Sequence, residues 1–181
     1  NLKSGGVLKP VQANMDIRHY TVALEVDPAA KTINGYTEIE LLLLKPSNEL
    51  LFDLWHGLTI SNIWVNGIEQ TFIHNEQDLV SIKLAQAFPA GKQLVKIAYG
   101  GTPAVSSRPP WVGGFQWEKD KNGNPWVSIT CQGEGAKIYF PCKDHPSDEP
   151  NEGADMIITI PRGLVATAPG LLQKVTNKGD K

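Results

Sequence analysis

The chemically most distinctive stretch of the sequence is QGEG at residues 132–135, which interrupts a strand-like alternation over residues 126–130. Gln132 and Glu134 are each followed by a glycine, whose missing Cβ atom lets another backbone or a ligand approach closely. An amide and a carboxylate presented in this way suit the binding of a protonated amine. The alternative is a β-bulge and a turn with both polar side chains solvated, because glycine within a strand most often marks a bulge.

Metal-dependent hydrolysis requires residues that this sequence lacks. A hydrolytic zinc site takes neutral imidazoles and a carboxylate, and a helical His-Glu-x-x-His motif supplies these ligands together with a general base. No such motif occurs in the sequence. We therefore expect no catalytic residue and no metal site in this chain. The histidines are widely separated, at His19, His56, His74 and His145.

Two further groups of candidate ligands have structural interpretations. Acidic residues crowd the region from Asp144 to Asp155, but their spacing matches no calcium loop. We favour a solvated turn in which Asp144 caps backbone N–H groups. Cys131 and Cys142 are the only cysteines and fit no zinc spacing. An oxidising compartment would allow a disulfide between them, but two buried thiols are the commoner state of so sparse a pair.

The composition is that of an ordinary globular chain, with 181 residues, 41% of them hydrophobic, and a formal net charge of -2. No run of Lys and Arg interleaves with aromatic residues, which argues against nucleic acid or an anionic membrane as a partner. The longest apolar run, residues 39–44, is far shorter than the ~20 residues that span a bilayer. We expect no transmembrane segment. The compartment stays open, because a first residue other than Met fits either a removed signal peptide or a shortened chain.

Period-two alternation of apolar residues predicts an all-β fold of twisted antiparallel sheets, arranged as a sandwich or a saddle. Asn66-Gly67 and Asn122-Gly123 supply the residues that tight hairpin turns require. We expect residues 1–15 to form an extended arm and residues 16–181 to form a single β-domain. The predicted strands cover residues 16–26, 32–44, 50–54, 58–65, 79–84, 93–101, 115–117, 126–130, 156–161 and 164–168.

The sequence FPCKDHP at residues 140–146 resembles the end of the N-terminal domain of M1-family (gluzincin) zinc aminopeptidases, the group that includes leukotriene A4 hydrolase and aminopeptidase N. In that family a strand with Gln-x-Glu or Gln-x-Gln leads into Phe-Pro-Cys-x-Asp-x-Pro, and every specified position of the second element is present here. The family's ungapped spacing puts Thr130 at the first Gln and Gln132 at the following Glu or Gln. Glu134 lies two residues further on, so its assignment rests on proximity.

The resemblance, which begins near Asp16, implies an N-terminal domain that helps to bind the amino terminus of a peptide through Gln132 and Glu134. It also implies that zinc, its ligands, the general-base Glu and a Gly-x-Met-Glu-Asn segment belong to a downstream catalytic domain, which is absent from this chain. The implied partners are therefore a peptide and the enzyme's own catalytic domain. Without His-Glu-x-x-His, the chain alone is expected to be inactive.

A different class of function follows from the tryptophans. Exposed Trp on a β-sandwich can stack on sugar rings, so a free-standing carbohydrate-binding module or a protein-interaction module is the alternative to a peptidase domain. Most large aromatic residues pack in the core or on a sheet face. Of Trp55, Trp64, Trp111, Trp117 and Trp126, we expect only Trp111, in a loop rich in Pro and Gly, to be exposed.

Overall fold

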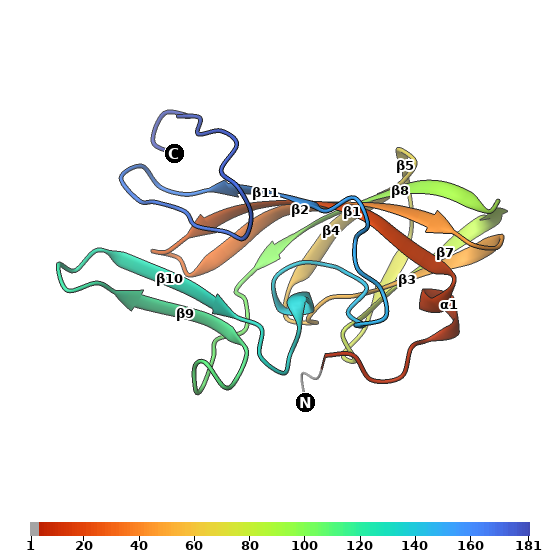
Figure 1. Ribbon diagram of the computed structural model, residues 1–181, viewed down its shortest axis with the longest axis horizontal. Coiled ribbons are helices and arrows are strands. Elements are labelled where there is room, and N and C mark those ends of the chain that lie inside the picture. The colour runs from red at the N-terminus through yellow and green to blue at the C-terminus, as the bar shows by residue number, and fades with distance from the viewer. Residues whose placement is uncertain (1–3) are drawn as a thin grey trace.

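The computed structural model describes residues 4–181 and consists mainly of β-strands (Figure 1). The first three residues of the predicted arm lie outside the described residues. The strands are β1 Met15–Asp27, β2 Thr32–Leu43, β3 Ser47–Asp53, β4 Thr59–Val65, β5 Ile68–Glu69, β6 Phe72–His74, β7 Leu79–Phe88, β8 Gly91–Gly101, β9 Gly114–Lys119, β10 Pro125–Thr130 and β11 Ala154–Thr159. The helices are α1 Pro10–Ala13 and the 3-10 helix η1 Ala136–Ile138.

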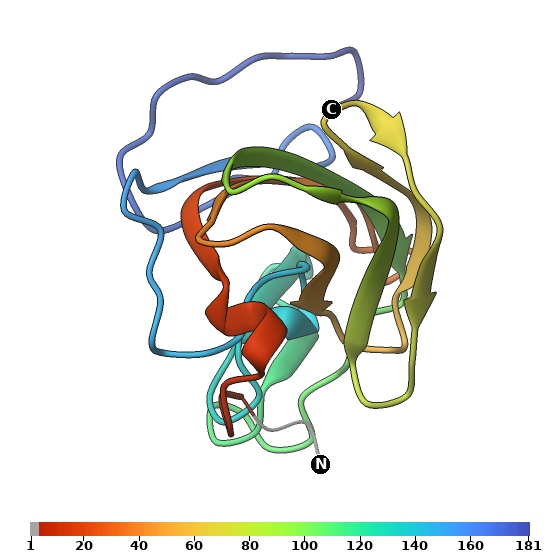
Figure 2. The same cartoon turned by 90° about the vertical axis from the view of Figure 1, so that its right-hand side faces the viewer.

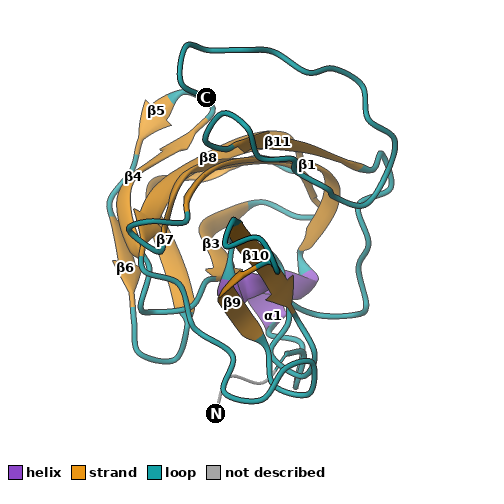
Figure 3. Cartoon of the chain, turned by 90° about the vertical axis from the view of Figure 1, so that its left-hand side faces the viewer, coloured by secondary structure: helices purple, strands orange, loops and turns teal. Residues whose placement is uncertain are grey.

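These strands form three sheets. The largest has six strands in the order β11-β1-β2-β8-β4-β5, the second has three in the order β3-β7-β6, and β10 and β9 form a two-stranded ribbon. The predicted all-β class is confirmed, and neighbouring strands of the described chain pair antiparallel except for β1 with β11, which are parallel. The six-stranded sheet curves over β3 and the ribbon, as the end-on views show (Figures 2 and 3).

The core lies under this curved sheet, and it explains the alternation in the sequence. In β8, Val95 and Ile97 are buried while Leu94, the residue before Val95, is exposed, because successive strand residues point to opposite faces. Phe52 of β3 and Phe115 of β9 are fully buried in the same cluster of apolar side chains. The ribbon is therefore attached to the rest of the domain through its inner face.

The hairpin turns follow the predicted residues. Asn66 and Gly67 have φ angles of 51° and 80°, the positive values that a type I′ turn requires, and they join β4 to β5. Asn122-Gly123 lies in the connection between β9 and β10, and Gly123 has a φ of 87°. Both predicted hairpins are thus present.

Two segments differ from the expectation of strands preceded by an extended arm. Residues 10–13 of the arm form the one-turn helix α1, in which Pro10 occupies the first helical turn, where its missing N–H costs nothing. The strand predicted at residues 164–168 is absent, so this prediction was wrong. Alternating residues form a stable strand only where a neighbour accepts their hydrogen bonds, and Val165 remains 88% exposed.

Candidate functional site

The QGEG sequence forms a turn between β10 and η1. Gly133 and Gly135 adopt φ angles of 80° and 79°, which residues with a Cβ atom rarely adopt, and the Gly135 N–H donates to Cys131 O at 3.0 Å. The pairing of β9 with β10 is regular up to Thr130, so the predicted bulge is not present within the ribbon. The turn begins where that pairing ends, and it presents Gln132 at the surface.

The two polar side chains of this turn have different surroundings. Gln132 is exposed, and its amide makes no hydrogen bond to the part of the chain that the structure describes. Glu134 is half-buried, and its Oε2 accepts a hydrogen bond from the Gly113 N–H at 2.5 Å. A Cβ atom at Gly113 would lie 2.5 Å from that oxygen, so glycine is needed for this contact. Solvation therefore describes Gln132 but not Glu134.

Asp144 of the FPCKDHP sequence is hydrogen-bonded to the N-terminal arm. Its Oδ1 accepts a hydrogen bond from Ser4 Oγ at 3.0 Å, and its backbone carbonyl accepts one from the Gly5 N–H at 3.0 Å. The predicted cap of backbone N–H groups after Pro141 is thus replaced by a contact with the N-terminal arm. Burial raises the pKa of Asp144, and hydrogen bonding to Ser4 opposes this shift.

Gly135 allows the close approach of Asp144. A Cβ atom at this glycine would collide with the Asp144 carboxylate and lie 2.6 Å from Ser4 Oγ. Its φ of 79° and ψ of 178° also fall in a region that is essentially restricted to glycine. The two sequence elements that carry the resemblance are therefore locked together at this residue.

We predict that Gly135→Ala destabilises the domain more than Gly133→Ala does. Both substitutions introduce backbone strain of about 1–3 kcal/mol, but a Cβ atom at Gly133 would meet nothing within 4 Å. The free energies of unfolding of the two variants in urea separate the two effects, because both variants carry the backbone strain and only Gly135→Ala adds the collision with Asp144. Equal losses of unfolding free energy would contradict close packing between Gly135 and Asp144.

The remaining residues of FPCKDHP anchor the motif to the core. Phe140 packs edge-on against Tyr20, with ring centroids 5.6 Å apart and planes at 77°. Cys142 and Asp53 exchange two backbone hydrogen bonds, at 2.7 and 3.0 Å, which attach the segment to the end of β3. The motif is thus a structural support for the turn that precedes it.

Two buried acids that contact residues of the segment 137–144 were not singled out from the sequence. Asp53 Oδ2 accepts from Gln12 Nε2 at 2.5 Å and from the Asp144 N–H at 3.1 Å. Asp78 accepts from the His56 N–H at 2.9 Å and lies 2.8 Å from His56 Nδ1. Burial raises the pKa of Asp78, but the His56 hydrogen bonds and the nearby ammonium of Lys137 outweigh it and lower the pKa overall. The only local signal is an acid next to a strand boundary, which is common in turns.

Comparison with known proteins assigns a family to this arrangement. The profile of the peptidase M1 N-terminal domain matches residues 17–163. The chain belongs to the peptidase M1 N-terminal domain family. No curated protein matches it in sequence.

Solved structures show the same fold as this M1 N-terminal domain. An M1 zinc metallopeptidase from Deinococcus radiodurans, bound to a Tyr-Ser-Ala substrate, superposes with a TM-score of 0.74 at 24% identity, over 93% of this chain and 38% of that one. Yeast leukotriene A4 hydrolase superposes with a TM-score of 0.70 at 21% identity, over 91% and 26%. The chain thus spans less than two-fifths of either protein.

The acidic region of this M1 N-terminal domain is divided among separate partners. Asp148 lies 2.7 Å from Lys143 Nζ, and Glu152 lies 3.1 Å from a guanidinium nitrogen of Arg18. Within residues 4–181 no three His, Cys, Asp or Glu side chains are grouped so that they could hold a metal ion. The residues that the structure describes therefore do not fit a zinc site. No helix in this range is long and apolar enough to cross a bilayer.

Cysteine and tryptophan exposure departs from the expectations in two places. Both cysteines are free thiols, but only Cys142 is buried, whereas Cys131 is exposed beside the turn. Trp111 is 66% exposed, as predicted, but Trp126 is 61% exposed as well. Trp126 lies opposite Glu118 on the outer face of a two-stranded ribbon, and packing of the ribbon's inner face against the core leaves that side chain in solvent.

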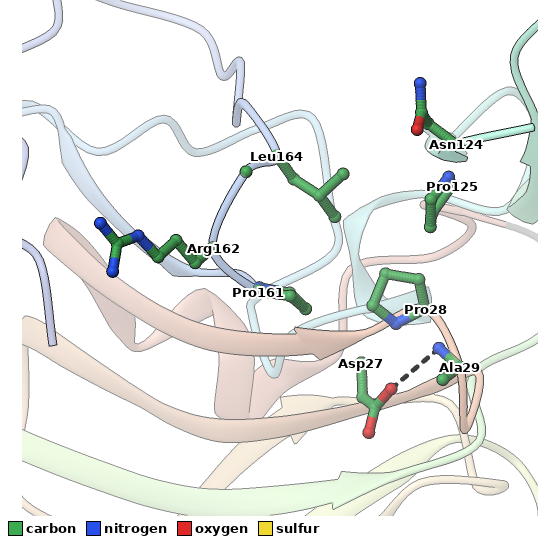
Figure 4. A pocket seen from close by; sticks show the side chains of 9 residues that line it. Asp27, Pro28, Ala29, Asn124, Pro125, Pro161, Arg162 and Leu164 are labelled. Atoms are coloured by element: carbon green, nitrogen blue, oxygen red, sulfur yellow. Dashed lines mark hydrogen bonds between the residues drawn. The ribbon is translucent and has the colours of Figure 1, made fainter. Parts of the chain in front are cut away.

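A cavity of about 430 Å³ lies at the other end of the ribbon, between its tip, the β1–β2 turn and residues 161–164 (Figure 4). Its walls are mainly apolar, with Pro28, Pro125 and Leu164 around the opening. Asp27 Oδ1 is already engaged by the Ala29 N–H at 2.8 Å. None of the lining residues belongs to the segment 130–146, so this cavity is separate from the candidate site.

Proposed function

We propose that this chain is the substrate-binding and structural N-terminal domain of a zinc metallo-aminopeptidase that removes N-terminal residues from peptides. The observation that carries the proposal is the amide of Gln132, which is exposed and unpaired among the described residues although the turn around it is fixed. A polar group held ready on a rigid support is what a binding site requires.

The chemistry of the turn suits an ammonium group. The side-chain carbonyl of Gln132 can accept one of the three N–H donors of a peptide's α-ammonium. Glu134 keeps Oε1 available while Oε2 is bound to Gly113, so its carboxylate supplies charge close by. The Deinococcus radiodurans metallopeptidase is bound to a Tyr-Ser-Ala substrate, and we assign a peptide substrate to the parent of this chain as well.

The catalytic step itself is assigned to another domain. A zinc ion held in that domain would supply a Lewis acid for the scissile carbonyl and for a water, and the role of Gln132 and Glu134 in this chain is to hold and orient the amino terminus. Orientation alone can lower the activation free energy substantially, because a reactant held in productive geometry avoids much of the entropic cost of the reaction. The enzyme's own catalytic domain is therefore the macromolecular partner that we propose.

The proposal is tested with the 181-residue chain and with its parent protein. We expect the parent to release the first residue of peptides with a free α-amine and to lose this activity on chelation of zinc. The isolated chain should cleave no aminoacyl anilide and retain no stoichiometric zinc after dialysis. A parent that is inactive on every free-amine peptide, or a chain that retains one zinc per molecule, would refute it.

Exposure of both Trp111 and Trp126 supports carbohydrate binding as a second candidate. This function predicts saturable quenching of tryptophan fluorescence by glycans. We expect no such response, and a titration abolished by Trp111→Ala would make the carbohydrate function the main one.

A further inference from the structure

The N-terminal arm crosses the turn that carries Gln132, although the two segments lie far apart in the sequence. The Ser4 N–H donates to Gly133 O at 2.9 Å, so the arm contacts the backbone of the turn directly. Ser4 Oγ donates to Asp144 Oδ1 at 3.0 Å, and this carboxylate is the group against which Gly135 packs. Ser4 therefore contacts both the backbone of the turn, at Gly133, and the carboxylate of Asp144, against which the turn packs.

The rest of the arm is fixed well enough to hold Ser4 in place. The Gly5 N–H donates to Asp144 O at 3.0 Å, and His145 Nε2 lies 3.2 Å from Gly6 O. Further along, Gln12 Nε2 donates to Asp53 Oδ2, the oxygen that also accepts the Asp144 N–H. The arm is thus attached near both of its ends: Gly5 is bound to Asp144, and Gln12 is bound to Asp53, which also binds Asp144.

The turn has few other attachments. Gln132 makes no side-chain hydrogen bond to residues 4–181, and the turn is open to solvent on the Gln132 side. Apart from the Gly135–Cys131 hydrogen bond within the turn, its hydrogen bonds to the described residues are those of Glu134 with the Gly113 N–H and of Gly133 O with the Ser4 N–H. The Asp144 carboxylate packs against Gly135. Removal of the Ser4 hydroxyl leaves the Ser4 N–H contact with Gly133 O in place, but it should loosen Asp144 and, through the packing of Asp144 against Gly135, the turn.

We propose that Ser4 is a positioning residue, which holds the turn at Gln132 in the orientation that binds a peptide's α-amine. This inference rests on the function proposed above, because it assigns a role to Ser4 through Gln132. Ser4 makes no contact with substrate in this scheme. Its effect is to reduce the freedom of the residue that does, and small misplacements of such residues are costly: a shift of 1 Å can lower a rate by about 100-fold.

The first test is kinetic and uses the parent enzyme. We expect Ser4→Ala to lower kcat/KM for a free-amine peptide by about three- to tenfold, less than the limit for a full misplacement. Ser4→Thr keeps the hydroxyl and should restore most of the loss. Ser61→Ala removes a hydroxyl that donates to Ala98 O on the large sheet, and it serves as the control with no expected effect.

A double-mutant cycle with Gln132→Ala shows whether Ser4 acts through Gln132. In the Gln132→Ala background, Ser4→Ala should cause no further loss. An equal loss in both backgrounds would overturn the inference, and so would an unchanged kcat/KM in the single Ser4→Ala variant.

A second measurement does not depend on activity. Hydrogen exchange of the Gly135 amide, which donates to Cys131 O, should accelerate in Ser4→Ala but not in Ser61→Ala of the 181-residue chain. Unchanged exchange would refute the positioning role. If exchange accelerates while Gln132→Ala has no kinetic effect, Ser4 of the N-terminal arm holds the turn as inferred, and the proposed amine-binding function is the part that fails.

Discussion

Replacement of Lys143 by methionine is expected to destabilise the domain by about 3–5 kcal/mol, the typical cost of removing one partner of a buried ion pair. Lys143 Nζ donates to Met15 O and to Asp148 Oδ2, both at 2.7 Å. The side chains of Lys143 and Asp148 are only 5% and 10% exposed, so water cannot replace the lost ammonium. The substitution leaves Asp148 charged without its partner.

Urea unfolding of the 181-residue chain measures this loss. Lys96→Met is the matched control, because its ion pair with Glu38 is 36% and 34% exposed and such pairs contribute only about 0.2–1 kcal/mol. The double variant Lys143→Met/Asp148→Asn should recover part of the stability by removing the unpaired charge. A loss at Lys143 no larger than that at Lys96 would show that the pair is not structurally important.

The sheets follow from the sequence because their pattern is local. Alternation over β1, β2 and β8 reflects one buried face, and Asn66-Gly67 has the φ angles that its residues favour. Pairing between strands that are far apart in the sequence leaves no comparable local pattern of residues. The parallel pairing of β11 with β1, in which Tyr20 lies opposite Ala154, depends on the path of the intervening chain.

The candidate site likewise has a part that the sequence predicts and a part that only the fold reveals. Counting from the FPCKDHP sequence places Gln132 on the turn, because spacing along one chain is preserved locally. The residues that hold the turn come from elsewhere: Ser4 is 140 positions from Asp144, and Gly113 is 21 positions from Glu134. Each is a small or common turn residue without a distinguishing pattern, so only the folded chain reveals its partner.

Gln132→Ala in the parent enzyme is expected to lower kcat/KM for free-amine peptides by roughly one to two decades. A hydrogen bond to a charged group contributes about 1.5–3 kcal/mol, and every ~1.4 kcal/mol corresponds to a factor of ten. Folding should be nearly unaffected, because the side chain is exposed and makes no hydrogen bond within the described residues. Gln77→Ala removes the same group from another exposed turn and is the control.

The substrate supplies a second control, since the lost contact is to the amino terminus. An N-acetylated peptide, if it is cleaved at all, should be insensitive to Gln132→Ala. Glu134→Gln removes the negative charge but keeps an oxygen that can accept from the Gly113 N–H, so a smaller loss is expected than at Gln132. Unchanged kcat/KM in Gln132→Ala would remove this residue from the site. A larger loss at Glu134 would mean that the carboxylate, two residues further along the turn, is the principal ligand of the amine.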